Sequence, residues 1–330
     1  MTIDISILFT QVAVMVLMIF PGFFLAKFGL STEKLGKGIS NIVLYAAQPA
    51  LLISGYLFTD YNPEILGRML AVFVGSIVAH LIFIALAFLL FRKAPNGKKQ
   101  VLMFASIFTN AGYMGIPLLK AIFTDEVAIY GSIYVFVFNV FVWSIGSYIY
   151  TGEKKYISVR KMILNPATLS AAFGIVFFVL SAFDLNPFLM SFSANTPGFV
   201  AVKIFTDFIK GLEALVSPLA MIIIGLRLAE VNFRTVFKDK WLYIYLLFSM
   251  LAIPALIWGI TKILAVTTLY TDTTVANIML LTAAAPAATA TSMFAEKHDG
   301  DTRYAGVIVS ISSVLCVGTM LAVSLLTLIP

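Results

Sequence analysis

The residues best suited to hold a ligand lie in two short runs of small residues, each interrupted by proline. Residues 109–118 read TNAGYMGIPL and contain Asn110 and Pro117, and residues 283–292 read AAAPAATATS with Pro286 at their centre. Glycine and proline interrupt helices, and the N-terminus of a helix that restarts presents backbone N–H groups to an anion. The pattern predicts a carboxylate site built from backbone dipoles and neutral side chains.

The predicted binding residues come mainly from these two runs, joined by two polar residues that precede prolines elsewhere. They are Asn110, Ala111, Gly112, Tyr113, Pro117, Pro286, Ala287, Thr289, Thr291, Ser292, Gln48 and Ser217. Small residues also allow helices to pack closely, so packing is the alternative interpretation of the two runs. Repair of a helix kink is the alternative for Gln48 and Ser217.

Other polar side chains within apolar sequence are candidates for handling a coupling ion. His80 lies near the middle of an apolar run, and histidine titrates near neutral pH, so it is the candidate for proton coupling. A neutral histidine bonded to a helix carbonyl is the alternative. Asn139, Ser310 and Ser313 offer oxygen atoms for a Na⁺ site, with interhelical hydrogen bonds as the alternative. Beyond H⁺ or Na⁺, no cofactor is expected.

The composition shows which elements must position these residues. Of the 330 residues, 61% are apolar and 12% are charged, whereas soluble domains carry roughly 25% charged residues. This excludes a disordered chain, a nucleic-acid-binding domain and an ordinary cytosolic enzyme. One cysteine and two histidines exclude a disulfide framework and a His- or Cys-rich metal cluster. The chain also lacks a nucleotide-binding loop and the motifs of hydrolases and metalloproteases, so it is not expected to be an enzyme.

Apolar runs long enough to cross a bilayer predict an all-α polytopic membrane protein with ten transmembrane helices. The runs are 5–26, 39–58, 69–91, 101–119, 127–150, 162–183, 206–226, 241–261, 275–295 and 304–328. If the N-terminus is outside, 17 of the 22 lysines and arginines fall in inner loops. Cytoplasmic loops are enriched in these residues, so both termini are predicted to lie outside.

The two halves of the chain have prolines at similar positions. Residues 1–155 and 156–330 each carry a proline in the second span and a proline-containing break in the fourth. These prolines are Pro49, Pro117, Pro218 and Pro286. Because five spans is an odd number, the second half enters the membrane in the opposite sense. The expected architecture is an inverted 5+5 repeat, in which broken helices four and nine cross near the midplane.

The same segments resemble those of the auxin efflux carrier family over essentially the whole chain. The segments that carry the resemblance are residues 109–118, 285–289 followed by Ala295-Glu296 and Asp301, Gln48-Pro49, and Asn165-Pro166. The bile acid:sodium symporters, which have a related fold, are a weaker match. The resemblance implies a scaffold of helices one, two, six and seven, and a transport domain of helices three to five and eight to ten. It also implies a homodimer formed through the scaffold.

The resemblance implies a secondary transporter of small organic anions, including auxin in plants and malate or malonate in bacteria, that works by elevator-type alternating access. The loop between spans five and six, residues 151–160, is short, whereas many plant members carry a long cytosolic segment there. This favours a bacterial malate/malonate permease-like carrier in the plasma (inner) membrane. A membrane sensor that binds a ligand without net transport and a sodium-coupled organic anion symporter are the alternatives. Expected partners are the anion and the lipid bilayer, and no nucleic acid.

Overall fold

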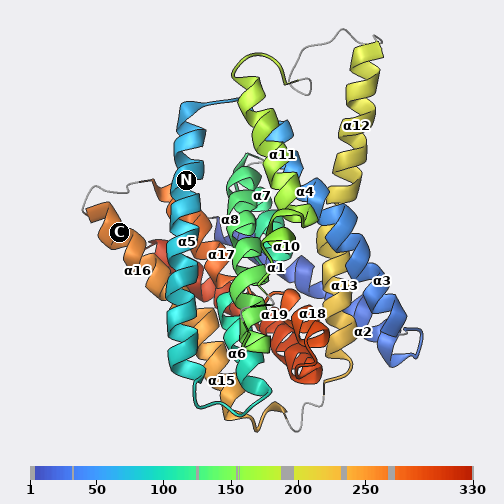
Figure 1. The fold of residues 1–330 in the computed structure, drawn as a ribbon, viewed down its shortest axis with the longest axis vertical. Coiled ribbons are helices and arrows are strands. Elements are labelled where there is room, and N and C mark those ends of the chain that lie inside the picture. The colour runs from blue at the N-terminus through green and yellow to red at the C-terminus, as the bar shows by residue number, and fades with distance from the viewer. Residues whose placement is uncertain are drawn as a thin grey trace.

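The computed structural model describes residues 4–31, 33–123, 126–153, 155, 157–186, 197–231, 236–266 and 272–328. Over these residues the protein is helical, and the one strand-like contact is an isolated antiparallel bridge between Thr109 and Ala287. Figure 1 shows α11 and α12 reaching one end of the molecule, the upper end of this view, with α6 and α15 near the opposite, lower end.

The helices of the first half follow the predicted runs closely. They are α1 (Ile5–Leu17), α2 (Ile19–Lys27), α3 (Glu33–Ile42), η1 (Val43–Ala47), α4 (Gln48–Leu57), α5 (Pro63–Phe91), α6 (Lys98–Ile107), η2 (Ala111–Gly115), α7 (Ile116–Ile122), α8 (Val127–Phe141), η3 (Val142–Gly146) and α9 (Ser147–Thr151). Those of the second half are α10 (Val159–Ile163), α11 (Pro166–Ser181), α12 (Pro197–Glu213), α13 (Val216–Leu228), α15 (Lys240–Leu247), η5 (Phe248–Ala252), α16 (Ile253–Val266), α17 (Thr273–Ala284), α18 (Ala290–Lys297), α19 (Thr302–Ser324) and η6 (Leu325–Leu328).

Within the described residues, seven helical stretches are long and apolar enough to cross a membrane. They are Ile5–Lys27, Lys34–Leu57, Pro63–Phe91, Val127–Thr151, Pro197–Leu228, Lys240–Ala265 and Thr302–Thr327. Three shorter apolar helices, Ala111–Ile122, Pro166–Ser181 and Thr273–Ala284, fall in predicted spans four, six and nine. The all-α polytopic class is therefore confirmed, and each predicted run contains an apolar helix.

Prolines explain several π-helical segments. η1, η2 and η5 each end two residues before a proline, respectively Pro49, Pro117 and Pro254. Proline cannot donate a hydrogen bond to the carbonyl four residues earlier, and its ring clashes with that carbonyl. The preceding turn therefore widens to a π-bulge. This places irregular backbone in the middle of apolar helices, including helix four.

Helix seven differs from the expected span of 206–226. The helix begins at Pro197, and a turn at Ala214 and Leu215 separates α12 from α13. Pro218 cannot donate to the Ala214 carbonyl, which explains why the chain breaks here. Some residues used to predict the orientation, Lys154 and Arg234, lie outside the described residues, as do the chain ends at 1–3 and 329–330.

Close contacts occur within each of the two predicted groups of helices and also between the groups. α2 packs against α13 so tightly that a Cβ on Gly225 would lie 2.0 Å from the carbonyl oxygen of Ile19. α4 packs against α11 and α12. Among the remaining helices, α5 contacts α6, α8 and α17, and α19 contacts α6, α17 and α18. Helices one, two, six and seven are here called the first set, and helices three to five and eight to ten the second set. The two sets also contact each other, since α1 and α13 pack against α19 and α4 packs against α8.

Two ion pairs tie the halves of the chain together inside the second set. Near the start of α5, Arg68 Nε donates to Oδ2 of Asp272 at 2.6 Å, and Asp272 also caps α17. At the start of α6, Lys98 Nζ lies 2.8 Å from Oδ2 of Asp239, which caps α15. The first pair connects helix three to helix nine, and the second connects helix four to helix eight. In both cases the third helix of one half is joined to the fourth helix of the other.

Both aspartates have lowered pKa values. Burial on its own would raise the pKa of Asp272, but the hydrogen bonds from Arg68 and from the Thr274 N–H lower it further than burial raises it. Asp239 behaves in the same way, with Lys98 as the opposing cation. The two carboxylates are therefore stabilised in their ionised form by the fold.

Candidate functional site

The interrupted segments of helices four and nine cross and bond to each other. The Asn110 N–H donates to the carbonyl of Pro286 at 2.7 Å, and the Ala288 N–H donates to the carbonyl of Phe108 at 3.0 Å. These reciprocal bonds satisfy backbone groups that the helix breaks would leave unpaired. The Ala287 N–H donates to Oγ of Ser312 at 3.2 Å, so α19 supports the crossing from behind.

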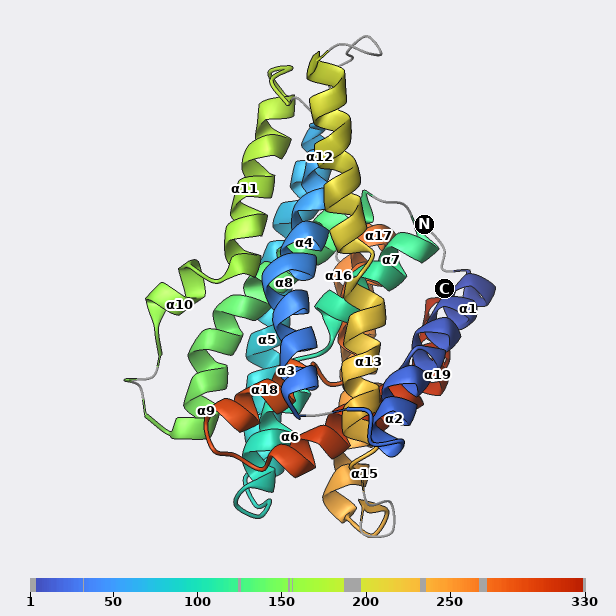
Figure 2. The same cartoon turned by 90° about the vertical axis from the view of Figure 1, so that its right-hand side faces the viewer.

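The crossing lies halfway through the fold, with a helix start on each side of it. α6 has ten residues, or about 15 Å at 1.5 Å per residue, which is half of the ~30 Å hydrocarbon core. The helix restarts after Asn110 in helix four, and α18 starts after Thr289 in helix nine. Figure 2 shows α7 above and α18 below this region. The N-termini of two half-helices therefore lie at the crossing, and each carries a partial positive charge.

A cavity of about 490 Å³, here called the crossover cavity, extends from the crossing toward the lower end of the molecule. Seven predicted site residues line it: Gln48, Asn110, Gly112, Tyr113, Asn139, Thr289 and Ser292. Thr109, which the sequence analysis did not select, also lines it and donates its hydroxyl to the Thr282 carbonyl at 2.8 Å. Aromatic side chains of Phe138, Trp143 and Phe294 complete the apolar part of the wall.

Several predicted residues do not line the crossover cavity. Ala111, Pro286, Ala287 and Thr291 are at the crossing but lie behind its wall, and Pro117 and Ser217 line a different cavity. Ser217 donates to the Tyr113 carbonyl at 3.2 Å, and the Tyr113 hydroxyl donates to Oε1 of Gln48 at 3.3 Å. These two bonds form a septum that separates the two cavities.

Asn110 has an unused hydrogen-bond donor beside the cavity. The residue is 3% exposed, and within the described part of the chain its Nδ2 has no hydrogen-bond partner. The hydroxyls of Thr291 and Ser292 also have none there. A buried donor without an acceptor is costly, so Asn110 and Ser292, which line the cavity, are well placed to bind an acceptor that enters it.

Charged residues line the lower part of the crossover cavity, and the sequence analysis did not select them as binding residues. Three are cationic (Lys37, Arg227 and Lys297), and Glu296 is anionic. Lys37 Nζ lies 2.7 Å from Oε1 of Glu296, and Arg227 Nη2 lies 3.7 Å from its Oε2. Lys297 Nζ lies 4.1 Å from the centre of the Trp143 ring. The excess of positive charge favours anions in the cavity.

His80 lines neither cavity. It is buried, and its Nδ1 lies 2.7 Å from the Ser76 carbonyl oxygen. Because a carbonyl only accepts, Nδ1 carries the hydrogen in this contact. The ring stacks on Phe141 at 5.1 Å between ring centres and is packed against Tyr134 and Phe108. The sequence left two roles open for His80, proton coupling and a neutral ring bonded to a helix carbonyl. These surroundings favour the second.

The residues considered for a cation site are dispersed. Asn139 lines the crossover cavity and donates Nδ2 to the Val135 carbonyl at 2.8 Å. Ser310 donates to the Ile224 carbonyl at 3.4 Å, and neither it nor Ser313 reaches the cavity wall. Ser312, which lies between them in α19, supports the crossing and donates its own hydroxyl to the Ile308 carbonyl at 2.7 Å.

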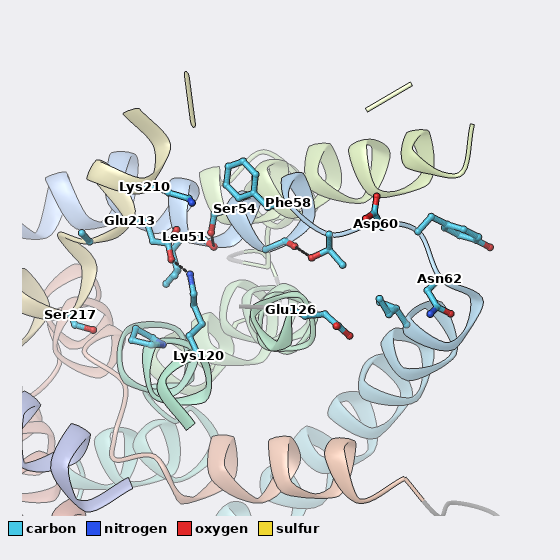
Figure 3. Close-up of a pocket in the computed structure, with 16 residues that line it drawn as sticks. Leu51, Ser54, Phe58, Asp60, Asn62, Lys120, Glu126, Lys210, Glu213 and Ser217 are labelled. Carbon is cyan, nitrogen blue, oxygen red and sulfur yellow. Dashed lines mark hydrogen bonds and ion pairs between the residues drawn. The ribbon is translucent and has the colours of Figure 1, made fainter. Parts of the chain in front are cut away.

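A second cavity of about 740 Å³, here called the vestibule, lies beyond the septum (Figure 3). It is lined by the end of α4, by α7 and by the junction of α12 with α13, including Ser54, Lys120, Lys210, Glu213 and Ser217. Lys120 and Glu213 form an ion pair there. Along helices two, four and seven the vestibule residues lie toward the opposite end from the crossover-cavity residues, so the septum divides two separate openings.

Comparison with known families agrees with this picture. A family model described as membrane transport protein, Mem_trans, matches residues 7–159 and 153–324. No curated protein matches the chain. The two matches together cover nearly the whole chain, including both broken helices and the cavity between them. The chain therefore belongs to the Mem_trans family of membrane transport proteins, the auxin efflux carrier family, which is a family of transporters and not of enzymes.

Proposed function

We propose that the protein is a secondary transporter of small organic anions and that it holds a carboxylate at the crossing of helices four and nine. One observation carries the proposal: the buried Asn110 amide, which lacks an acceptor among the described residues, lies beside two half-helix N-termini on the wall of the crossover cavity. A carboxylate accepts hydrogen bonds from a side-chain amide and from backbone N–H groups, and the partial charge of a helix N-terminus favours it.

The charges along the cavity support an anion rather than a neutral or cationic ligand. Lys37, Arg227 and Lys297 lie between the crossing and the lower end, with Glu296 as their one anionic neighbour on the wall. A positively charged approach raises the local concentration of an anion. The binding position itself has neutral side chains, so a bound carboxylate would be held by dipoles and released without breaking a buried ion pair.

The proposed mechanism is elevator-type alternating access in a ten-helix inverted repeat, 1–155 and 156–330. Contacts within each group, such as α2 with α13 and α5 with α8, support a scaffold of helices one, two, six and seven and a transport domain of the other six. The Arg68–Asp272 and Lys98–Asp239 pairs connect helices inside the transport domain and would let it move as one body. A homodimer through the scaffold, in a bacterial inner membrane with both termini outside, completes the proposal.

A thermal-shift screen of purified protein tests the proposed ligand class. Small mono- and dicarboxylates are compared with their carboxamides, which have similar size and no charge. We expect stabilisation by at least one carboxylate and none by its amide, because only the anion gains from the helix dipoles and the cationic wall. Equal stabilisation by acid and amide would contradict an anion site.

A further inference from the structure

At each end of the molecule, a lysine–glutamate pair joins the proposed transport domain to the proposed scaffold. At the upper end, Lys120 on α7 pairs with Glu213, the last residue of α12. At the lower end, Lys37 on α3 pairs with Glu296 on α18, at 2.7 Å between Nζ and Oε1. In each half of the fold, the second part of the broken helix is thus linked to the proline-kinked helix of the opposite half.

The arrangement repeats although the residues differ. Helices four and seven meet in the upper pair, and helices nine and two, their counterparts in the repeat, meet in the lower pair. The signs of the charges are exchanged, with the cation on the transport domain above and on the scaffold below. Both pairs lie on cavity walls, the upper one in the vestibule of Figure 3 and the lower one in the crossover cavity.

The two pairs differ in their exposure to solvent. The side chains of Lys120 and Glu213 are 21% and 13% exposed, whereas those of Lys37 and Glu296 are 54% and 34% exposed. Exposed ion pairs are weak and screened by salt, and partly buried ones are screened less. The upper pair is therefore the stronger contact, and Arg227 at 3.7 Å from Glu296 adds a second cation to the lower one.

We propose that these pairs are clamps that hold the transport domain in the conformation seen here, in which the crossing opens toward Lys37. The inference rests on the proposed function, because it assumes that the domain slides along the scaffold. A rigid sliding motion carries Lys120 away from Glu213 and Glu296 away from Lys37 together. Both clamps therefore favour this conformation over the one that opens toward Lys120, and loss of either shifts the population to the latter.

Cysteine labelling measures that population directly. Ser292 on the cavity wall is replaced by Cys in a Cys316→Ser background, and sealed vesicles of one orientation receive an impermeant maleimide on the Lys120 side only. The initial labelling rate is proportional to the fraction of protein whose crossing faces that side. We expect Lys120→Gln and Lys37→Gln each to raise the rate by roughly two- to fivefold, the range for single ion pairs.

Controls separate the clamps from a general effect of charge. Lys203 pairs with Asp207 at 3.0 Å within α12, so no domain movement separates them, and Lys203→Gln should leave the rate unchanged. The exchange Lys120→Glu with Glu213→Lys should restore the original rate. Glu213→Gln replaces Lys120→Gln if the latter does not fold. Unchanged rates in the clamp variants, or an equal rise in Lys203→Gln, would overturn the proposal.

Transport by the wild-type protein is measured in parallel. Substrate counterflow together with unchanged labelling rates would contradict the clamps and leave the transporter intact. Labelling rates that shift as expected, without counterflow of any tested anion, would contradict the proposed function and leave the clamps as a conformational device.

Discussion

Asn110 uses its backbone and its side chain in different ways. Its backbone N–H is used in the crossing, its carbonyl accepts from Met114 and Gly115, and its side-chain Nδ2 has no partner in the described part of the chain. The backbone thus fixes the position of the side chain, and the amide remains available to a ligand. Polar side chains inside membranes are costly unless they bind something, which is why Asn110 is the proposed anchor.

Replacing Asn110 by Ala should weaken carboxylate binding by about 1–3 kcal/mol, or roughly 5- to 150-fold in Kd. The half-helix dipoles remain in the variant, so binding should weaken rather than disappear. Calorimetry on folded protein measures the change. Wild-type affinity combined with a lower melting temperature would instead assign Asn110 to helix packing.

His80 is the residue for which the contacts change the expectation most. Its ring is enclosed by aromatic side chains and its Nδ1 bonds to the Ser76 carbonyl. His80→Ala should therefore lower stability by about 3 kcal/mol, as expected for loss of a buried ring. Uptake driven by a pH gradient should retain its pH dependence in this variant. If that dependence is lost while exchange continues, His80 carries the coupled proton.

At the scale of helices, the positions of helix breaks are easier to predict than the tertiary contacts around them. The sequence predicted interruptions at 109–117 and near Pro286, and the structure has both, because proline and glycine act locally. The lower-end cations Lys37 and Arg227 were assigned to loops from their position at the ends of apolar runs. Their place on the cavity wall depends on how α3, α13 and α18 pack, which no local pattern encodes.

The ion pairs between helix ends provide a test at this scale. Asp272→Asn keeps a helix cap on α17 but removes the charge that pairs with Arg68, so stability at pH 7 should fall by about 1 kcal/mol. Because the fold lowers the pKa of Asp272, the wild type should lose this contribution as pH falls below 3.8, the ordinary value for aspartate.

Thermal melts in detergent at pH 7 and at a series of pH values extending below 3.8 measure both effects. The variant should show a smaller loss of stability on acidification than the wild type, because it has one fewer carboxylate to protonate. Asp207→Asn, on the exposed face of α12, is the matched control and should change little. An identical acid response of wild type and Asp272→Asn would show that the ion pair does not brace the domain.

For the molecule as a whole, the sequence indicated the membrane class and the family. Both depend on apolar content and on two broken helices, which can be recognised without knowing how the helices pack. The two cavities, the septum of Gln48, Tyr113 and Ser217, and the clamps could not be predicted in this way. Lys120 and Glu213 are 93 residues apart in the chain, so their pairing depends on how α7 and α12 pack. No local pattern in the sequence indicates that Glu213 lines the vestibule.

The measurement that tests the central claim most directly is substrate counterflow in proteoliposomes loaded with the carboxylate that stabilises the protein best. Wild-type protein should exchange internal unlabelled anion for external labelled anion, because a carrier site reaches both sides in turn. Asn110→Ala should need a higher external concentration for half-maximal exchange, and the carboxamide should not exchange. If the anion binds but is not exchanged, the protein is a sensor and the account of transport through the crossover is wrong.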